Sequence, residues 1–384
     1  MKKICVLTAT RAEYGLLKRV IQKLQQIDLF DIRVVATGAH LSPEFGLTYR
    51  EIEEDGINID EKIEILLSSD SSAAISKSMG LAMISFADYF QRLKPDLLLV
   101  LGDRYETLSV CCVAVIQNIP IAHLYGGETT EGAVDEVIRH AISKMSYIHF
   151  TSTEAYRNRV IQLGEEPKRV FNVGSLGVEN AHNEKLFNKN ELEVELSWKL
   201  DKPYAVVTFH PVTLEKASSE WQISELLKAV ELNPQYQYIF TKSNADCDGR
   251  IINQLIDDFV KKHENCNVYH SLGMKRYLSA VKYANFVMGN SSSGIVEVPT
   301  FKIPTINIGD RQKGRVKAES VFNCKSSFEN IDMLIKSIPK KNTKTVVNPY
   351  EKRGTSDFII EKIHHYLYCE EIELKKKFYD LEVI

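Results

Sequence analysis

The sequence predicts an α/β protein made of two doubly wound domains, each with a parallel sheet and crossover helices. Short β-rich apolar runs alternate with longer helical patterns, which is typical of parallel strands joined by helices. The alternation occurs twice, because a polar stretch from Asn183 to Lys202 separates a second series from the first. At 384 residues the chain is also too long for one ordinary core, which favours two domains.

The first series begins with a strand at Ile4–Thr8 and a helix at Glu13–Gln26. The helix carries an apolar stripe at helical spacing, formed by Leu16, Leu17, Val20, Ile21 and Leu24. Further strands are expected at Ile32–Thr37, Asp96–Leu101, Pro120–Leu124, Ile148–Thr151 and Val170–Val173. These elements predict a first domain over residues 1–182.

The second series predicts another domain over residues 183–356. Its strands are expected at Ala205–Phe209, Tyr236–Thr241, Val268–Tyr269, Phe286–Met288 and Thr305–Ile308. The remaining residues, 357–384, are expected to form a helical tail. The charged run Glu370–Lys377 within it is interpreted as a solvated face.

The composition excludes several classes of protein. A net charge of -3 gives no reason to expect a nucleic-acid partner, and no apolar run is long enough to span a membrane. Polar residues interrupt the first apolar run too early for a signal peptide. The seven cysteines show no CxxC spacing, so we expect reduced thiols in a cytoplasmic protein and no metal site.

A candidate anion site follows two strands of the second series. The segment Gly289–Gly294 (GNSSSG) ends one strand and opens a helix, where free backbone amides and the helix dipole suit a phosphate. A serine-rich helix cap would explain that segment alone. However, Arg311, Lys313 and Arg315 follow the next strand, and these cations make an anion site the better interpretation.

A candidate cluster of carboxylates follows strands of the first series. Asp103 and Glu128 come directly after apolar strands, where the ligand sites of parallel sheets lie. Nearby, Asp135, Glu136, Arg139 and His140 open a helix, and i, i+4 spacing lets Asp135 pair with Arg139 and Glu136 with His140. A capped helix with ordinary surface pairs explains Glu136 and Arg139 equally well.

Other familiar sites are not indicated. The sequence has no GxxxxGK[ST] loop, and no GxGxxG follows the first strand, so neither a P-loop nucleotidase nor an NAD enzyme is expected. His364 and His365 are adjacent on a helix and face different ways, which argues against a metal site. His149 lies inside an apolar strand and is interpreted as a core histidine with one hydrogen bond.

The motifs together resemble one enzyme family over essentially the whole chain. In order they are Thr10–Gly15 (TRAEYG), Thr37–His40 (TGAH), Gly102–Arg104 (GDR), Gly126–Glu128 (GGE), Asp135–His140 (DEVIRH), Phe209–Thr213 (FHPVT), Gly289–Gly294 (GNSSSG) and Gly309–Gln312 (GDRQ). The chain resembles the hydrolysing UDP-N-acetylglucosamine 2-epimerases of sialic-acid-type and legionaminic-acid-type pathways.

This resemblance implies a GT-B-like fold, in which two Rossmann-like domains face each other across a cleft and the second holds most of the UDP. The residues implied to contact UDP are Arg11, Arg104, His210, Asn244, Ser291, Ser292, Glu297 and Arg311. Leu272 is expected near the uracil and His40 on the sugar side. No cofactor is expected, and the family suggests a homodimer or homotetramer.

The implied reaction converts UDP-N-acetylglucosamine and water to N-acetylmannosamine and UDP, the first step of sialic-acid-type synthesis. Loss of UDP and removal of the C2 proton give a 2-acetamidoglycal, which is then hydrated. Two faces of the sugar require at least two proton carriers, and Asp103, Glu128 and Asp135 are the candidates. The same reaction on UDP-N,N'-diacetylbacillosamine is an alternative. A GT-B glycosyltransferase and a non-catalytic UDP-sugar sensor are more distant ones.

Overall fold

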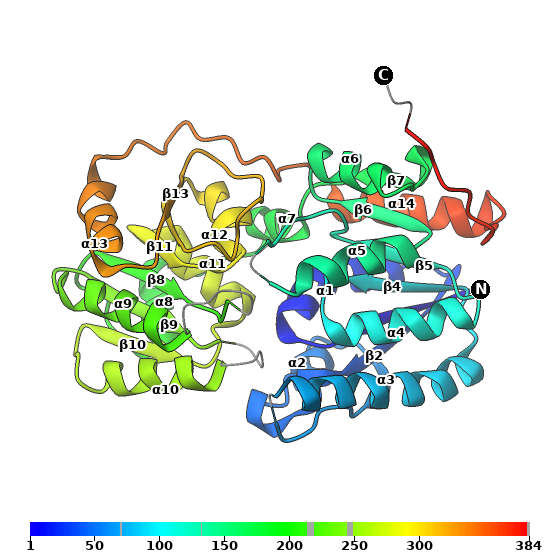
Figure 1. Ribbon diagram of the computed structural model, residues 1–384, viewed down its shortest axis with the longest axis horizontal. Helices are drawn as coiled ribbons and strands as arrows, with labels where there is room; N and C mark the ends of the chain where they lie inside the picture. Colours follow the sequence, from blue (N-terminus) through cyan, green and yellow to red (C-terminus); the bar gives the residue numbers. More distant parts are fainter. Residues whose placement is uncertain (70, 132, 213–218, 244–248, 382–384) are drawn as a thin grey trace. The chain divides into compact units, whose positions relative to one another are not determined.

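The fold consists of two compact α/β units (Figure 1). The computed structural model describes residues 1–384 except 70, 132, 213–218, 244–248 and 382–384. The first unit comprises residues 1–128, 135–179 and 352–384, and the second comprises residues 129–134 and 180–351. Each unit contains a parallel sheet, which confirms the predicted fold class.

The sheet of the first unit has seven strands in the order β3-β2-β1-β4-β5-β6-β7. The strands are β1 (Lys2–Thr8), β2 (Phe30–Thr37), β3 (Ile59–Ile63), β4 (Leu97–Leu101), β5 (Ile121–Leu124), β6 (Ile148–Thr151) and β7 (Val170–Asn172). The strand order reverses at β1, so the loops after β1 and β4 diverge there. In doubly wound sheets, ligands bind beside such a reversal, outside the carboxyl ends of the strands.

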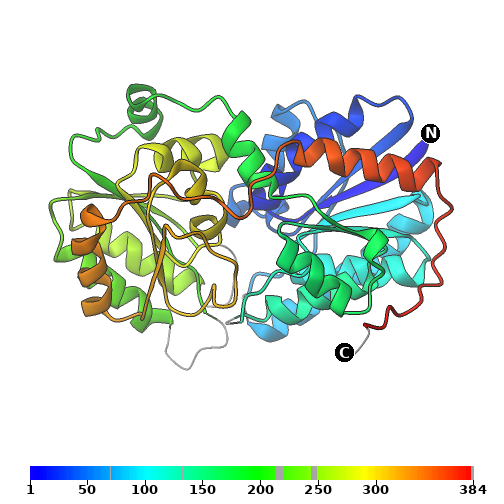
Figure 2. The same cartoon turned by 90° about the horizontal axis from the view of Figure 1, so that it is seen from above.

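Helices cover both faces of this sheet (Figure 2). They are α1 (Arg11–Gln25), α2 (Tyr49–Glu54), α3 (Ser72–Leu93), α4 (Tyr105–Ile116), α5 (Asp135–Met145), α6 (Glu154–Gln162) and α14 (Thr355–Tyr368), with 3-10 turns η1 (Gly38–Leu41), η2 (Pro43–Phe45) and η3 (Pro167–Arg169). One apolar cluster joins the sheet to α1 and α14, and another joins it to α3 and α4. The sheet is therefore buried on both faces, which explains its continuous apolar strands.

The C-terminal segment belongs to the first unit. Ile359 and Ile363 of α14 are fully buried in the cluster that also contains α1. Between the end of α14 and residue 381, the last one described, there is no helix or strand. Lys376 Nζ nevertheless lies 2.9 Å from both carboxylate oxygens of Glu165, which is 1% exposed. The charged run at 370–377 is thus not only a solvated face, because one of its lysines neutralises a buried carboxylate.

The second unit has a six-stranded sheet in the order β10-β9-β8-β11-β12-β13. Its strands are β8 (Tyr204–Thr208), β9 (Gln237–Thr241), β10 (Cys266–Tyr269), β11 (Phe286–Gly289), β12 (Thr305–Ile308) and β13 (Val321–Cys324). Its helices are α8 (Lys189–Leu196), α9 (Ser219–Glu231), α10 (Gly249–Val260), α11 (Gly273–Tyr283), α12 (Ser293–Val296) and α13 (Phe328–Ser337), with η4 (Val298–Phe301) and η5 (Ile338–Lys340). The order reverses at β8, beside β11.

The chain passes from one unit to the other a few residues before the domain boundaries that the sequence suggested, at 182 and 356. The chain passes between units within α7 (Leu176–Asn183), after residue 179, and again after residue 351. The polar stretch 183–202 is not a bare linker, because Leu192 and Leu196 of α8 are buried in the second unit. Within the described residues, no helix combines the length and the apolar character that crossing a membrane requires.

Candidate active site

Arg139 organises the carboxylates at the carboxyl edge of the first sheet. Its side chain is 1% exposed and forms an ion pair with Asp103, which follows β4. Nη1 also donates to a Glu136 carboxylate oxygen at 3.0 Å and to the Glu128 carbonyl oxygen at 3.0 Å. One guanidinium therefore fixes the loop after β4, the loop after β5 and the start of α5 relative to one another.

Glu128 is placed by a tight turn and a buried hydroxyl. Its side chain is 5% exposed, and Ser152, which follows β6, donates to a carboxylate oxygen at 2.6 Å. Gly127 has φ 77°, and a Cβ there would collide with the Tyr156 carbonyl oxygen. Glycine is thus required immediately before Glu128.

The first turn of α5 supplies two further carboxylates. Asp135 is its first residue and is half-buried. Glu136 pairs with Arg139 at i, i+3, and its other oxygen lies 3.0 Å from His140 Nε2. The sequence pattern suggested Asp135 as the partner of Arg139 and did not select Glu136 as catalytic. The structure brings Glu136 onto the guanidinium that holds Asp103.

His123 of β5 supports the loop that carries Asp103, and sequence reasoning did not identify it. Nε2 lies 2.8 Å from the Gly102 carbonyl oxygen, to which it donates, and Nδ1 lies 3.3 Å from Ser143 Oγ. Burial lowers the pKa of His123 to about 3. The ring is therefore neutral and holds the residue before Asp103.

His40 lies in η1 and does not present a free ring nitrogen. Nε2 lies 2.9 Å from Thr8 Oγ1, and Nδ1 lies 2.8 Å from Thr48 Oγ1. Burial lowers its pKa to about 4. Both nitrogens join the end of β1 to the turn that precedes α2, and the expected contact of His40 with the sugar stays a prediction. Arg11, at the start of α1, pairs with Glu51 at 2.6 Å.

A second group of charges lies around Arg104, directly after Asp103. Arg104 makes a two-pronged ion pair with Glu106, at 3.1 and 3.2 Å, and Glu106 is 1% exposed. Glu13 accepts from the backbone amides of Ala9 and Thr10, which completes the cap of α1. Burial raises the pKa of Glu13 to about 7; Arg104 opposes the shift and Glu106 adds to it.

Asn290 joins three loops at the carboxyl edge of the second sheet. It is fully buried; its side chain accepts from the His210 amide at 2.7 Å and donates to the His210 carbonyl at 2.8 Å. Its own carbonyl oxygen accepts from Gln312 at 2.9 Å and from Arg311 at 3.2 Å. The loops after β8, β11 and β12 are thus held together, and the predicted anion-binding residues lie on them.

The serines of this edge follow a close approach between strands. Gly289 has φ 134°, and a Cβ there would collide with the Thr208 carbonyl oxygen of the neighbouring strand. Ser291 and Ser292 are half-buried and lead into α12, which Glu297 caps at its carboxyl end. His210 Nδ1 lies 3.2 Å from Ser243 Oγ.

Leu272 and Asn244 are also expected near the nucleotide, but neither has an exposed side chain among the described residues. Leu272 is 2% exposed and packs in the apolar core of the second unit with Tyr204 and Val281. Its side chain is therefore part of that core, and its expected place near the uracil stays a prediction. Asn244 lies outside the described residues.

The segment that follows Glu128 packs on the loop that carries Arg311. Residues 129–134 group with the second unit. Within it, the Glu131 amide donates to the Lys313 carbonyl at 3.4 Å, and the two side chains form an ion pair at 3.3 Å. The residues that directly follow Glu128 in the sequence thus belong to the second unit.

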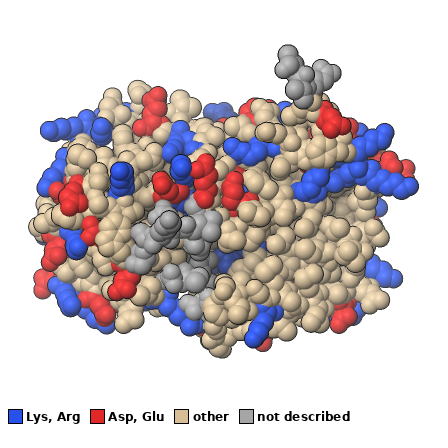
Figure 3. All heavy atoms as spheres, in the orientation of Figure 1, with Lys and Arg blue, Asp and Glu red and all other residues tan. Residues whose placement is uncertain are grey.

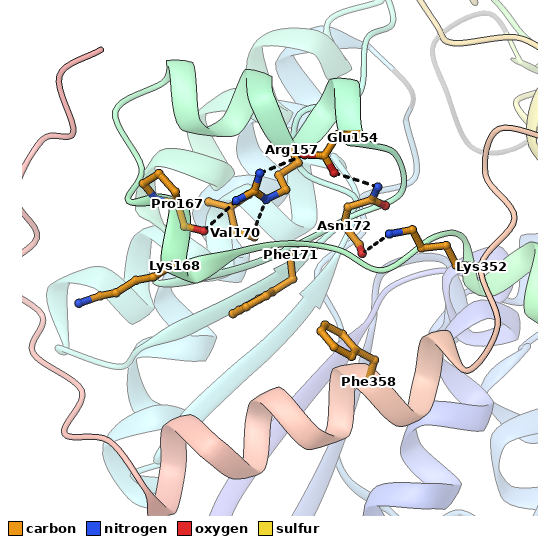
Figure 4. A pocket seen from close by; sticks show the side chains of 9 residues that line it. All are labelled: Glu154, Arg157, Pro167, Lys168, Val170, Phe171, Asn172, Lys352 and Phe358. Carbon is orange, nitrogen blue, oxygen red and sulfur yellow. Dashed lines mark hydrogen bonds and ion pairs between the residues drawn. The ribbon is translucent and has the colours of Figure 1, made fainter. Parts of the chain in front are cut away.

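A hollow of about 220 Å³ lies elsewhere on the first unit, beside the edge strand β7 (Figure 4). Arg157 donates to the Val170 carbonyl at 2.8 Å, and Lys352 donates to the Asn172 carbonyl at 3.0 Å. These cations cover the outer carbonyls of the sheet edge, which protects it from pairing with another strand. Across the part of the chain that is described, no group of three His, Cys, Asp or Glu residues is arranged for a metal ion.

Comparison with known proteins identifies the family. Residues 22–364 match the family model described as UDP-N-acetylglucosamine 2-epimerase. The chain belongs to this family. It is 46% identical over 344 residues to the GDP/UDP-N,N'-diacetylbacillosamine 2-epimerase (hydrolyzing) of Campylobacter jejuni subsp. jejuni serotype O:2, covering 89% of each chain.

Two further matches describe the range of similarity. The chain is 45% identical over 324 residues to polysialic acid biosynthesis protein P7 of Escherichia coli, covering 84% of this chain and 82% of that protein. The crystal structure of the Neisseria meningitidis UDP-GlcNAc 2-epimerase bound to UDP-GlcNAc superposes with a TM-score of 0.79 at 18% identity, covering 95% of this chain and all of that one. This family member therefore has the GT-B-like fold of such enzymes.

Proposed function

We propose that the protein is a hydrolysing 2-epimerase that converts UDP-N-acetylglucosamine and water to N-acetylmannosamine and UDP. The observation that carries the proposal is the set of carboxylates that Arg139 and Ser152 hold at the edge of the first sheet. A protein that only bound a UDP-sugar would need the anion-binding loops of the second unit. It would not need several carboxylates fixed around one buried guanidinium.

The chemistry requires such groups. The hydrogen on C2 of the sugar is not next to a carbonyl, so it is not acidic in the ground state. When the C1–O bond breaks, its electron pair leaves with UDP, and the oxocarbenium-like centre at C1 makes the C2 hydrogen acidic. A carboxylate takes that proton, and the C1–C2 double bond of 2-acetamidoglucal forms.

Hydration completes the reaction. Water adds its oxygen at C1 and loses a proton, while an acid delivers a proton to C2 from the opposite face, which gives the manno configuration. General acids and bases contribute about 10²–10⁴-fold each. Asp103, Glu128 and Asp135 are the proposed proton carriers, and the position of Glu136 on Arg139 adds it to the set.

The proposed role of the second unit is to hold UDP. Arg311 carries charge toward the leaving diphosphate, and the half-buried Ser291 and Ser292 offer hydroxyls beside the backbone amides that open α12. Arg11 and Arg104 of the first unit and His210 and Glu297 of the second are further proposed contacts. The pair of Arg104 with Glu106 fixes that guanidinium before any ligand binds.

A second candidate substrate is UDP-N,N'-diacetylbacillosamine. It is favoured by the 46% identity to the Campylobacter jejuni enzyme that is named for it. The two substrates differ at C4 and C6 of the sugar, whereas the argument for the chemistry concerns C1 and C2. The mechanism is therefore the same for either.

The deciding experiment incubates the purified protein with each UDP-sugar in D₂O and identifies the products by NMR. We expect free UDP and a 2-epimeric sugar with deuterium at C2, and the substrate with the higher kcat/KM is the one for which the enzyme is adapted. A product that keeps its original C2 hydrogen would refute the elimination route. Sugar transferred to an acceptor would indicate a glycosyltransferase, and UDP-sugar binding without turnover would indicate a sensor.

A further inference from the structure

We propose that Gly314 and Thr129 form a contact through which the loop that carries Arg311 positions Glu128. This loop, residues 309–315, follows β12 and is here called the Arg311 loop. The role rests on the proposed function, in which Glu128 carries a proton and Arg311 contacts the diphosphate. Gly314 acts through Glu128, so it is a positioning residue and not a catalytic one.

The Arg311 loop is held in a fixed conformation. The side chain of Gln312 is fully buried and donates to the Asn290 carbonyl oxygen at 2.9 Å, to which Arg311 also donates at 3.2 Å. The Lys313 amide donates to the Asp310 carbonyl oxygen at 2.9 Å, which closes the loop on itself. A segment that packs on this loop is therefore held in place.

The residues that follow Glu128 pack on this loop. Thr129 and Thr130 are 6% and 3% exposed, and the Glu131 amide donates to the Lys313 carbonyl oxygen at 3.4 Å. These residues and the Arg311 loop belong to the second unit, whereas Glu128 belongs to the first. The peptide bond between residues 128 and 129 therefore joins the proposed proton carrier to residues that the Arg311 loop holds.

Gly314 allows the close approach of the two segments. It has φ 83°, and a Cβ there would collide with Thr129 Cγ2 and lie 3.2 Å from Thr129 Cβ and 2.9 Å from Glu131 Oε1. The Glu131 side chain can move aside, because it is 49% exposed. Thr129 cannot, because it is buried and its β-branched side chain has few rotamers. Its backbone must therefore shift, and Glu128 must shift with it.

The ion pair between Glu131 and Lys313 contributes little to this contact. The two side chains approach to 3.3 Å, but both are largely exposed to water, which weakens their attraction. Figure 3 shows Lys and Arg side chains next to Asp and Glu side chains at several places on the surface, so an exposed pair is ordinary in this protein. The packing of Thr129 on Gly314 is therefore the main link.

Glu128 is thus supported from two directions. Ser152 donates to its carboxylate and Arg139 donates to its carbonyl oxygen, both within the first unit. On its carboxyl side, Thr129 packs on Gly314. A catalytic group that is misplaced by about 1 Å can lower the rate by about 10²-fold, so the loss of either support should be visible in turnover.

The test measures turnover and UDP affinity of Gly314→Ala. With the better of the two UDP-sugars, we expect kcat to fall by roughly 10²-fold, while calorimetry gives a UDP dissociation constant close to that of the wild type, because Arg311 is unaltered. Gly46→Ala is the matched control. Gly46 has φ 86° and no atom within 4 Å of a Cβ, so this variant has similar backbone strain without a collision and should keep kcat.

A second pair of variants separates packing from charge. Thr129→Ser removes the methyl group that a Cβ at position 314 meets, so adding it to Gly314→Ala should recover most of the lost kcat. Glu131→Gln removes the exposed ion pair and should leave kcat unchanged. In the wild type, UDP should slow hydrogen exchange of the backbone amides of residues 129–131, a measurement that does not depend on whether Gly314→Ala folds.

Circular dichroism and thermal unfolding show whether each variant is folded. A folded Gly314→Ala variant with wild-type kcat would overturn the proposal, as would a double variant without recovery or amides whose exchange UDP does not change. A loss of UDP affinity as large as the loss of kcat would mean that Gly314 supports the nucleotide site instead. A wild type that turns over neither UDP-sugar would overturn the proposed function itself, which distinguishes the two failures.

Discussion

At the scale of single residues, Arg139 does the most to define the candidate site. It is a buried cation with two carboxylate partners and a carbonyl, so the cost of removing its charge from water is offset by good geometry. A planar guanidinium can bind three groups in fixed directions, which an ammonium cannot. We therefore propose that Arg139 positions the proposed proton carriers and does not itself carry a proton.

Arg139→Lys keeps the positive charge but replaces the planar guanidinium, whose several N–H donors point in fixed directions, with a single ammonium. We therefore expect kcat to fall by about 10²-fold, because Asp103 and Glu136 lose their fixed orientation. UDP affinity should change little, since Arg139 binds carboxylates of the first unit. Steady-state kinetics with UDP calorimetry separates the two effects. A variant with near wild-type kcat would show that the carboxylates are positioned by other groups.

We expect substitutions in the first unit to impair proton transfer and substitutions in the second unit to impair UDP binding. Asp103→Asn and Glu128→Gln keep shape but cannot carry the proton, so each should lower kcat by roughly 10²-fold or more with little change in UDP affinity. Arg311→Ala should instead weaken UDP binding by about 1.5–3 kcal/mol, because it removes a charge-assisted contact. If Asp103→Asn lost UDP binding as severely as Arg311→Ala, this division of roles would be wrong.

Glu13 predicts a pH dependence of stability. Its pKa is about 7 in the folded protein, above the ordinary carboxyl value of 4.5, so the folded state holds this proton more tightly than the unfolded state. The stabilisation is complete below about pH 4.5 and is lost as pH rises through 7, by up to roughly 3 kcal/mol. Glu13→Gln, which carries no charge, should therefore gain stability relative to wild type between pH 5 and pH 8. Denaturant unfolding at both pH values measures the difference, and a constant difference would contradict the prediction.

At the scale of elements, strands that consist mostly of apolar residues can be predicted from the sequence, whereas strands with few apolar residues cannot. Every strand expected from the sequence is present within one or two residues at each end. The edge strands β3 and β13 were not expected, because β3 reads Ile-Asp-Glu-Lys-Ile and β13 is mostly half-exposed. An edge strand has few apolar neighbours, so its sequence need not be apolar.

The same limit applies to the site. Asp103 and Glu128 could be identified because they follow apolar strands. The roles of Arg139, Ser152 and His123 could not, since each depends on a contact with a residue from another segment: Arg139 with Asp103, Ser152 with Glu128, and His123 with Gly102. The burial of the Leu272 side chain in the core could not be predicted either, because its position before a helix says nothing about which way its side chain packs.

The turn before Glu128 can be tested with two glycines of similar backbone conformation. Gly127 has φ 77° and a Cβ there meets the Tyr156 carbonyl, whereas Gly56 has φ 75° and open space around it. Gly56→Ala should therefore cost about 1–2 kcal/mol from backbone strain alone. Gly127→Ala should cost more and should also lower kcat, because Glu128 must shift. Equal losses of thermal stability, with full activity, would mean that the turn adapts.

At the scale of the whole molecule, the C-terminal segment stabilises the first unit through a buried cluster of charges. Glu165 is held by Lys376, by Lys144 at 2.8 Å and by His149 at 3.2 Å. Burial raises the pKa of Glu165, but these hydrogen bonds and charges outweigh it and lower the pKa to about 2. The carboxylate is therefore ionised at neutral pH, and its partners are needed.

Lys376→Met should lower the free energy of unfolding by about 1.5–3 kcal/mol, because a buried carboxylate loses a charged hydrogen-bond donor. Lys375→Met is the control, since Lys375 is exposed beside it and should have almost no effect. Thermal unfolding of both variants at pH 7 measures the difference. Similar unfolding midpoints for the two variants would show that Lys144 and His149 are enough to stabilise the Glu165 carboxylate without Lys376.

The division of the first unit into three chain segments has a consequence for the order of folding during synthesis. Ile359 and Ile363 complete the apolar cluster around α1, yet they are made after the whole of the second unit. The second unit therefore has all of its residues, 129–134 and 180–351, as soon as residue 351 leaves the ribosome, whereas the first unit must wait for α14 with one face of its sheet incompletely covered. We therefore expect the first unit, which carries the proposed proton carriers, to become fixed after the second unit, which carries the proposed UDP-binding loops.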